Sequence, residues 1–384
     1  MRLTCCCILV WGFFIFPSEI TFAQQPDSSA VQDSLLMALQ KEMASFAEPD
    51  GQAQSGRTAA RLVPTRNPDI SVIGDIRAGY RSDGERNVDL GVEEIELALK
   101  SVIDPYARAD VYLSMAREDG EIEFELEEAF ITTMSLPHTL QLKAGKFRNT
   151  VGKINLIHPH ALPFVTMPAV YTNFLGDEGL NDQGVSLSWL VPNGSFYQEL
   201  TFEITRGPDE SPSFSTDDGN RLLYTGHLKN FWDLSENSTF ELGLTGINGP
   251  NDLGLTSTLA GFDITYKWKP VRYNRYKSFT LQAETFFSFR STDSGRINSM
   301  GLYALASYQL AERWMLLARY DHSDLPDDPD WNENGVSSTL GWLLTEFQKV
   351  EFGVRRSWGD KIKASYAGVV RVVFVIGTHG AHQY

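Results

Sequence analysis

The tripeptide His158-Pro159-His160 carries two imidazoles within three positions, and imidazole nitrogen is a common ligand of zinc. Two further histidines, His379 and His382, stand near the C-terminus. A His-x-His pair alone is weak evidence for a metal, because ordinary hydrogen bonding within a loop is the more common explanation. Zinc binding by His158 and His160 is therefore kept as a minor alternative, and no cofactor is expected.

Catalytic motifs are missing from the sequence, which contains no GxSxG, no HExxH, no P-loop and no GxGxxG after an expected strand. His227 and His322 fall on expected strands, and neither has a recognisable serine partner. The segment 324–335 resembles a calcium loop, but its glycine comes late and no glutamate closes it. We therefore expect no enzyme, and an outer-membrane hydrolase that uses His227 or His322 is a third alternative.

The elements that must position these residues alternate apolar and polar side chains over nine or more residues. In AGFDITYKWK, for example, Phe262 and Ile264 share one face, whereas Asp263 and Lys267 share the other. Alternation of this kind indicates a strand with one apolar and one polar face, and about ten residues suffice for a tilted strand to cross a bilayer. The sequence predicts sixteen such strands, at 70–80, 91–101, 105–117, 121–134, 138–147, 182–192, 197–206, 220–232, 237–248, 257–269, 276–290, 299–310, 313–322, 336–346, 349–357 and 365–377.

The connections between these strands alternate between long, such as RSDGERNVDL and STDSGRIN, and short, such as IDP and NGS. This asymmetry is typical of bacterial outer-membrane barrels, with short turns on the periplasmic side. We therefore predict an all-β fold, a 16-stranded antiparallel transmembrane β-barrel with an aqueous lumen. Its topology separates His158 and His160 from His379 and His382, so the two pairs cannot share one site. The connection at 270–276 is unusually long for a turn on the periplasmic side.

The N-terminus reads as an export signal followed by a leader. Residues 1–23 combine Arg2, a short apolar run and a small-residue exit before Gln24, which predicts a signal peptide. All three cysteines, at positions 5, 6 and 7, would leave with it. Residues 24–68 are expected to be a periplasmic leader, either disordered or a short helix, and residues 69–384 the barrel. The net charge of −16 argues against binding to nucleic acid.

Charged residues of both signs fall on the polar face of the strands. We predict that they line the pore and set its selectivity through their field, although cross-strand ion pairing that only stabilises the wall is the competing explanation. Because the first strands carry more acids, a modest cation preference is expected. The predicted residues are Glu96, Lys100, Arg108, Asp110, Glu123, Glu125, Lys143, Asp263, Lys267, Glu284, Arg319, Asp321, Arg355 and Arg371, and Glu127 and Glu351 share their parity.

Residues 148–181 form the third outward loop and break the alternation with three prolines and a cluster of apolar side chains. A loop of this length inside a compact domain is usually functional or disordered. Because its apolar side chains require burial, we predict that it folds back against the inner wall and narrows the pore. Lys153, His158, His160, Asp177 and Glu178 would then lie at the constriction. A rigid lid on the outer rim is the alternative.

Several segments resemble a family of bacterial porin-like outer-membrane proteins that is distantly similar to phosphate-selective porins. The resemblance rests on DPYARADVYLS, LQLKAGKFRNTVGKINLIHPHALPF and NFLGDEGLNDQGVSLSWLVPN, and it extends over residues 70–384. Some relatives are labelled zinc-regulated TonB-dependent outer-membrane receptors. Such receptors resemble barrels of about 22 strands with a folded plug domain, and the stretch from Ile70 to Ile376 is too short for that many spanning strands.

The sequence thus predicts a porin of the bacterial outer membrane that passes small hydrophilic solutes or ions by diffusion. The alternative is an outer-membrane uptake receptor or binding barrel, with metal among its candidate ligands. The expected partners are outer-membrane lipid, lipopolysaccharide bridged by divalent cations at the acidic outer rim, the transported solutes, the barrel-assembly machinery and, as a homotrimer, two further copies of the chain.

Overall fold

The computed structural model describes residues 68–83, 88–118, 121–192, 194–208, 211–215, 221–328 and 330–377. The chain divides into two units, Met1–Ala60 and Arg61–Tyr384, and all described residues belong to the second. The predicted signal peptide, almost all of the leader, and His379 and His382 lie outside the described ranges. Predictions about them therefore stay predictions.

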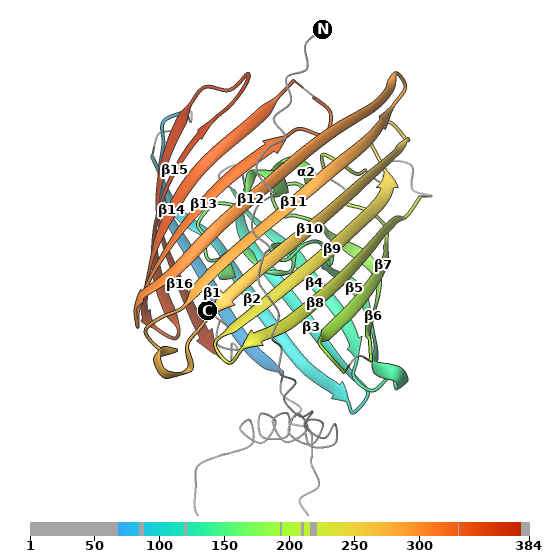
Figure 1. Ribbon diagram of the computed structural model, residues 1–384, viewed down its shortest axis with the longest axis horizontal. Coiled ribbons are helices and arrows are strands. Elements are labelled where there is room, and N and C mark those ends of the chain that lie inside the picture. Colours follow the sequence, from blue (N-terminus) through green and yellow to red (C-terminus); the bar gives the residue numbers. More distant parts are fainter. Residues whose placement is uncertain are drawn as a thin grey trace, which may run out of the picture. The chain divides into compact units, whose positions relative to one another are not determined.

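Sixteen antiparallel strands form a closed barrel in which each strand pairs with its neighbours in sequence and β1 pairs with β16 (Figure 1). The predicted fold class and strand number are confirmed. The strands are β1 (Asp69–Arg81), β2 (Val88–Asp104), β3 (Ala107–Glu118), β4 (Glu121–Thr133), β5 (Leu140–Arg148), β6 (Asn181–Leu190), β7 (Tyr197–Thr205), β8 (Leu223–Ser235), β9 (Ser238–Pro250), β10 (Thr256–Trp268), β11 (Phe279–Thr292), β12 (Gly295–Ala311), β13 (Trp314–Asp324), β14 (Asn332–Thr345), β15 (Gln348–Trp358) and β16 (Ser365–Gly377).

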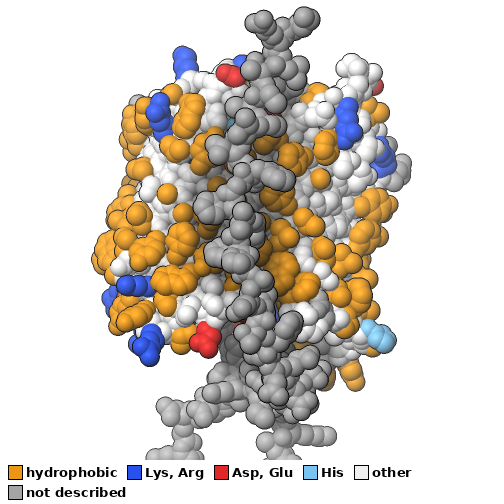
Figure 2. Space-filling model, viewed as in Figure 1, with side chains coloured by type: hydrophobic (Ala, Val, Ile, Leu, Met, Phe, Trp, Pro, Cys, Tyr) orange, Lys and Arg blue, Asp and Glu red, His pale blue; other side chains and the backbone are white. Residues whose placement is uncertain are grey.

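Alternating side chains explain why these segments form a barrel with an apolar outer surface. On β10, Asp263 is 1% exposed and faces inward, whereas the neighbouring Phe262 is 40% exposed and faces outward. Figure 2 shows hydrophobic side chains over the visible outer surface, with Lys and Arg side chains toward its two ends. The outward-facing cross-strand pair Trp314 and Trp342 stacks at 5.5 Å between ring centroids, as expected of an aromatic girdle. Among the described residues, no helix is long and apolar enough to cross a membrane.

The two ends of the barrel differ in their connections, and we call them the turn end and the loop end. β1 begins and β16 finishes at the turn end, where Ser71 pairs with Gly377. The long connection at this end, between β10 and β11, contains η4 (Val271–Tyr273) and is held to the adjacent turn by a 2.9 Å hydrogen bond from Val271 N to Asn237 Oδ1.

One expected long connection is short. STDSGRIN was expected to be a loop, but β11 and β12 extend through it and meet at Asp293 and Ser294. Gly295 follows with a φ of 142°, a conformation that glycine adopts readily and that permits so tight a hairpin.

Candidate functional site

The inserted loop, residues 149–180 between β5 and β6, folds into the barrel as predicted (Figure 1). It contains η2 (Ile154–Leu156), η3 (Pro159–Ala161) and α2 (Ala169–Leu175). Proline fixes φ near its helical value and lacks an N–H, which suits Pro159 to the first position of η3. Gly176 ends α2 with a φ of 100°. The prolines and this glycine therefore divide the loop into short, stiff turns.

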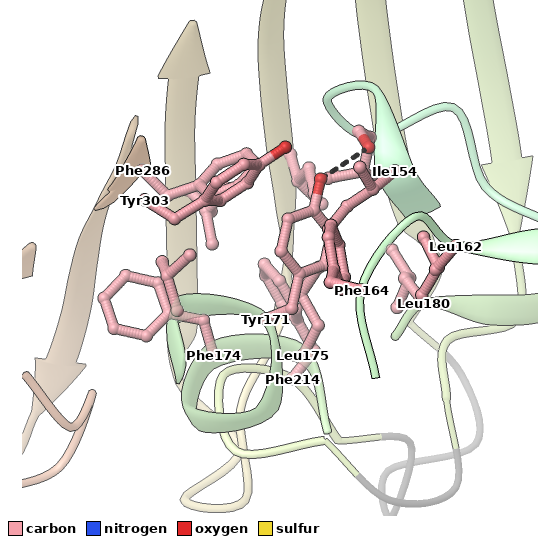
Figure 3. Close-up of a cluster of buried hydrophobic side chains, with 14 of the residues drawn as sticks. Ile154, Leu162, Phe164, Tyr171, Phe174, Leu175, Leu180, Phe214, Phe286 and Tyr303 are labelled. Atoms are coloured by element: carbon pink, nitrogen blue, oxygen red, sulfur yellow. Dashed lines mark hydrogen bonds between the residues drawn. The ribbon is translucent and has the colours of Figure 1, made fainter. Parts of the chain in front are cut away.

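A cluster of buried apolar side chains holds α2 against one side of the inner wall (Figure 3). Tyr171 and Phe174 of α2 are fully buried there, and the Tyr171 ring meets Phe286 of β11 edge-on, with ring centroids 5.5 Å apart. Several inward-facing wall residues are apolar at this place, whereas other inward-facing wall residues, such as Thr245 and Ser288, are polar. The apolar ones are Leu223, Ile247, Leu259, Phe286, Tyr303, Leu305 and Leu317.

Two wall glycines make room for the loop. A Cβ atom at Gly301 of β12 would lie 2.5 Å from Cγ2 of Val170, and one at Gly353 of β15 would lie 2.2 Å from Cγ2 of Val165. Both distances are far shorter than a normal van der Waals contact, so the loop sits directly on the backbone of the wall.

On the β13–β16 side of the lumen, three inward-facing cations bind carbonyl oxygens of the inserted loop. These carbonyls lie in irregular backbone, where buried acceptors need partners from elsewhere in the fold. The contacts are Arg319 Nη1 to Thr166 O (2.6 Å), Arg371 Nη2 to Pro159 O (2.7 Å) and Lys349 Nζ to Leu162 O (3.3 Å).

Two buried wall carboxylates hold the other parts of the loop. Glu203 of β7 accepts hydrogen bonds from Thr150 Oγ1 at 2.8 Å and from Asn149 Nδ2 at 3.1 Å. Glu284 of β11 accepts one from the Tyr171 hydroxyl at 2.5 Å and one from the backbone N–H of Lys153 at 3.1 Å. Carboxylates accept several hydrogen bonds at once, which lets each of them fix two loop groups.

The histidine pair lies against β2 and β4. His158 Nδ1 is 2.9 Å from Glu96 Oε2 and 3.2 Å from Glu127 Oε1, and its Nε2 is 3.3 Å from Glu128 Oε1. His160 Nδ1 lies 3.4 Å from the same Glu96 oxygen. Burial opposes the charged form of His158, but the three neighbouring carboxylates outweigh it and raise its pKa well above its ordinary value.

The inserted loop therefore contacts the wall on several sides and lines two cavities. One cavity of about 340 Å³ is lined by Gln141 and Ser188, near the turn end, and by Lys153 of the loop. The other, of about 650 Å³, is lined by Arg81 and Arg117, near the loop end, and by residues 164–167 of the loop. The two cavities share no lining residue.

Comparison with known proteins gives one informative relative in sequence. No family model matches the chain. An uncharacterized protein of Aquifex aeolicus (strain VF5) is 31% identical over 357 residues, which cover 80% of this chain and 73% of the relative. The chain belongs to the same protein family as this Aquifex protein. This relationship identifies the family without identifying its activity.

Solved structures share the fold at low sequence identity. The Vibrio cholerae outer membrane protein OmpT, in its trimer form, is similar over 81% of this chain and 100% of its own, with a TM-score of 0.56 and 10% identity. Salmonella typhi OmpF, in complex with daunomycin, covers 80% of this chain and 97% of its own, with a TM-score of 0.54 and 10% identity. These neighbours are outer-membrane, porin-like barrels, so the porin-like part of the resemblance is confirmed at the level of the fold.

The strand residues predicted to line the pore occupy positions that face inward by alternation. Most of them, however, pair with other residues of the barrel wall. Arg319 lies 3.0 Å from Asp321, Arg108 lies 2.5 Å from Asp110, Arg355 lies 2.8 Å from Glu333, and Glu125 lies 2.8 Å from Lys146. Lys100 and Lys143 lie over the rings of Tyr112 and Phe130, Asp263 is buried, Lys267 is half-buried, and Glu123 is exposed.

The predicted constriction residues are distributed over the inserted loop. Lys153 pairs with Glu241 of β9 at 2.9 Å, and Asp177 and Glu178 line cavities toward the loop end. Only Glu96, His158 and His160 of the predicted set come together in one cluster of potential metal ligands. The roles of these residues in conduction stay predictions.

Alternation placed Glu127 on the inward face, but it missed Glu93 and Glu128 at two β-bulges. A bulge adds one residue to a strand and changes which side chains face inward. The pairing of β3 with β4 skips Glu127, so that Glu127 and Glu128 are both buried. The pairing of β1 with β2 skips Glu93 in the same way. Two successive glutamates inside an alternating strand are the sequence feature that marks both places.

Proposed function

We propose that the protein is an outer-membrane channel for small hydrophilic solutes or ions, and that the inserted loop controls passage through it. The observation that carries the proposal is the loop's position in the lumen. It is fixed to the wall by Glu203 and Glu284 on one side and by Arg319, Lys349 and Arg371 on another, with a cavity toward each end of the barrel.

The two faces of the barrel support this function. The outward face is rich in apolar side chains, which suits contact with lipid, whereas the inward face carries ionisable side chains such as Asp110, Glu284 and Arg319. Sixteen strands enclose a lumen wide enough for water, which in this protein contains the inserted loop.

Acidic residues predominate near the first strands, so we propose a modest preference for cations. Glu93 and Glu94 of β2 and Glu127 of β4 line the larger cavity. They lie there with Arg77, Arg117 and other cations, so the preference depends on the balance of nearby opposite charges.

Planar-bilayer recording of the refolded protein tests the proposal. Deletion of residues 156–176 should increase single-channel conductance, and a salt gradient should give a reversal potential of the sign expected for cations. A variant with the outer segment 326–330 shortened is the matched control, because this segment joins β13 and β14 outside the inserted loop. Equal conductance of the deletion variant and the parent, with both correctly folded by circular dichroism, would contradict control by the loop.

An uptake receptor is the second candidate, favoured by the separation of the two cavities. A barrel whose lumen stays closed would hold a ligand in the cavity near the loop end until an energised step released it. Electrical silence of the parent in bilayers, combined with uptake that depends on the inner-membrane energising complex, would support the receptor and exclude the diffusion channel.

The wall histidines fit a non-enzymatic function. His227 Nδ1 lies 2.9 Å from Thr245 Oγ1, and His322 Nδ1 lies 3.0 Å from Asn334 Oδ1, which are hydrogen bonds between neighbouring strands. Lipopolysaccharide, the barrel-assembly machinery and a homotrimer are proposed partners. Analytical ultracentrifugation in detergent tests the trimer, for which the Vibrio cholerae structure is a precedent in fold.

A further inference from the structure

We infer that Glu96, His158 and His160 form a binding site for a divalent first-row transition metal ion inside the barrel, with Glu127 beside it. Two imidazoles and one carboxylate, with the fourth position open to water, are a ligand set that suits Zn²⁺, and the metal would connect the inserted loop to β2.

The spacing of the ligand atoms fits a tetrahedral ion. Metal bonds of about 2.0–2.1 Å place neighbouring tetrahedral ligand atoms roughly 3.3 Å apart. Glu96 Oε2 lies 2.9 Å from His158 Nδ1 and 3.4 Å from His160 Nδ1. The potential ligand atoms of Glu96, His158 and His160 all lie within 4.8 Å of one another.

The buried oxygens of the cluster lack the hydrogen bonds that would otherwise satisfy them. Glu96 is 1% exposed and Glu127 is 4% exposed. Within the part of the chain that the structure describes, Glu127 Oε2 has no hydrogen-bond partner, and Glu96 Oε2 approaches both imidazoles without the alignment of a hydrogen bond. Atoms that converge in this way are arranged for a shared cation.

Charge balance supports a cation at the same place. The carboxylates of Glu94, Glu96, Glu127 and Glu128 gather here, and Arg148 pairs with Glu127 and, at 3.7 Å, with Glu128. Arg148 offsets part of this negative charge, and charge in a buried site needs a nearby opposite charge. Protonated imidazole supplies such a charge when no metal is present, and a divalent ion would supply more of it.

Glu128 is not a proposed ligand, but it contacts the second ring nitrogen of the ligand His158. Its Oε1 lies 3.3 Å from His158 Nε2, so Nδ1 is the nitrogen left to bind a metal. A carboxylate that accepts the other N–H of a ligating histidine fixes the tautomer and ring orientation, and such partners typically contribute 10–100-fold in metal affinity. Tyr112 packs on the same ring, with centroids 4.7 Å apart.

Metal binding is tested directly on the full-length mature protein without an affinity tag. His379 and His382 are replaced by glutamine in every sample so that the C-terminal histidines cannot contribute. Chelator-treated protein is dialysed against micromolar free Zn²⁺, and bound zinc is measured by mass spectrometry. We expect one zinc per chain, and X-ray absorption should show two imidazole nitrogens among its ligands.

Single substitutions locate the site. H158Q, H160Q and E96Q should abolish stoichiometric binding, and E128Q should weaken it about 10–100-fold. H227Q is the matched control, because His227 is a buried wall histidine bonded to Thr245 and should leave one zinc bound. Absence of zinc from the parent, X-ray absorption without imidazole ligands, or equal zinc content in H158Q and H227Q would overturn the site. The first two outcomes need no variant to fold.

The consequence for conduction rests on the channel function proposed above, whereas metal binding itself does not. A bound ion would hold His158 and His160 on the wall, so zinc should reduce channel opening and a chelator should restore it. Zinc binding by an electrically silent barrel would uphold the site and contradict the channel. Conduction by a barrel that binds no zinc would uphold the channel and contradict the metal site.

Discussion

The hydroxyl of Tyr171 donates a 2.5 Å hydrogen bond to Oε2 of Glu284, and both side chains are fully buried inside the barrel. Tyr171 belongs to the inserted loop and Glu284 to the wall strand β11. The same carboxylate accepts hydrogen bonds from the backbone N–H of Lys153 and from the hydroxyl of Tyr303 on β12. One buried wall residue thus fixes two separate parts of the loop.

Substitution of Tyr171 by phenylalanine should loosen the loop without changing its apolar packing. A hydrogen bond to a charged group contributes about 1.5–3 kcal/mol, so loop release should become roughly 10- to 150-fold more frequent. The matched control is Tyr303→Phe, which removes a hydroxyl from the same carboxylate but leaves Tyr171 bonded. Single-channel recording measures the opening frequency, and equal frequencies in the two variants would contradict a special role for the loop contact.

A disulfide between the loop and the wall should lock the channel closed. A Cβ atom at Gly353 would lie 3.4 Å from Cβ of Val165, close to the usual separation of about 3.5–4.5 Å in disulfides. The three native cysteines precede residue 8, so protein produced without residues 1–23 and carrying V165C and G353C would contain only this pair. Oxidised protein should conduct less than wild type, and reduction should restore conductance.

The single variants V165C and G353C, treated with the same oxidant, show whether either substitution alone disturbs the barrel. Unchanged conductance of the oxidised double variant, with disulfide formation verified by mass spectrometry, would mean that solutes pass beside a stationary loop.

Cation preference should decrease as the pH falls through neutrality because of Glu178. Burial of its carboxyl and the neighbouring Glu125 carboxylate raise the pKa of Glu178 to about 7, although Arg148 opposes the shift and part of the residue stays exposed. Glu127 adds to the increase. Above this pH the carboxylate is charged and favours cations at the loop-end cavities, and below it the charge is lost.

Reversal potentials measured between pH 6 and pH 8 test this dependence. Glu178→Gln should abolish it, whereas Asp177→Asn, which removes the adjacent exposed carboxylate, should retain it. The assignment fails if the wild-type potential does not change over this range or if the E178Q variant changes as much as wild type.

The barrel was predictable from the sequence because the alternation of apolar and polar residues that defines each strand is a local feature. Each strand alternates because one face meets lipid and the other the lumen, so Phe262 and Asp263 can be assigned to opposite faces from their order alone. The inward direction of the loop was predictable for a similar reason, since its apolar side chains require burial. The alternation of polar and apolar residues does not explain Leu259, whose side chain faces inward and is apolar. Its partner, the loop, is about eighty residues or more away in the sequence.

The pairing of the charged residues was not predictable. Which cation meets which carbonyl depends on how the loop crosses the lumen, so the bond from Arg371 to Pro159 cannot be read from either segment alone. The bulge at Glu127 changes which of the following β4 side chains face inward, and it brings Glu127 and Glu128 together beside His158. The histidine pair could be found from its spacing, but its carboxylate partners required the three-dimensional structure.

Removal of the Arg371 guanidinium should destabilise the barrel strongly. Arg371 is fully buried, lies 2.9 Å from Asp75 and 3.3 Å from Glu351, and donates to two loop carbonyls. Loss of one partner from a buried ion pair costs about 3–5 kcal/mol, so Arg371→Gln should lower the free energy of unfolding by that amount. Arg81→Gln is the matched control, because its ion pair with Asp83 at 3.6 Å is exposed and its loss should cost about 1 kcal/mol or less. Urea unfolding in lipid vesicles measures both, and similar losses would show that Arg371 has no special role in joining the wall to the loop.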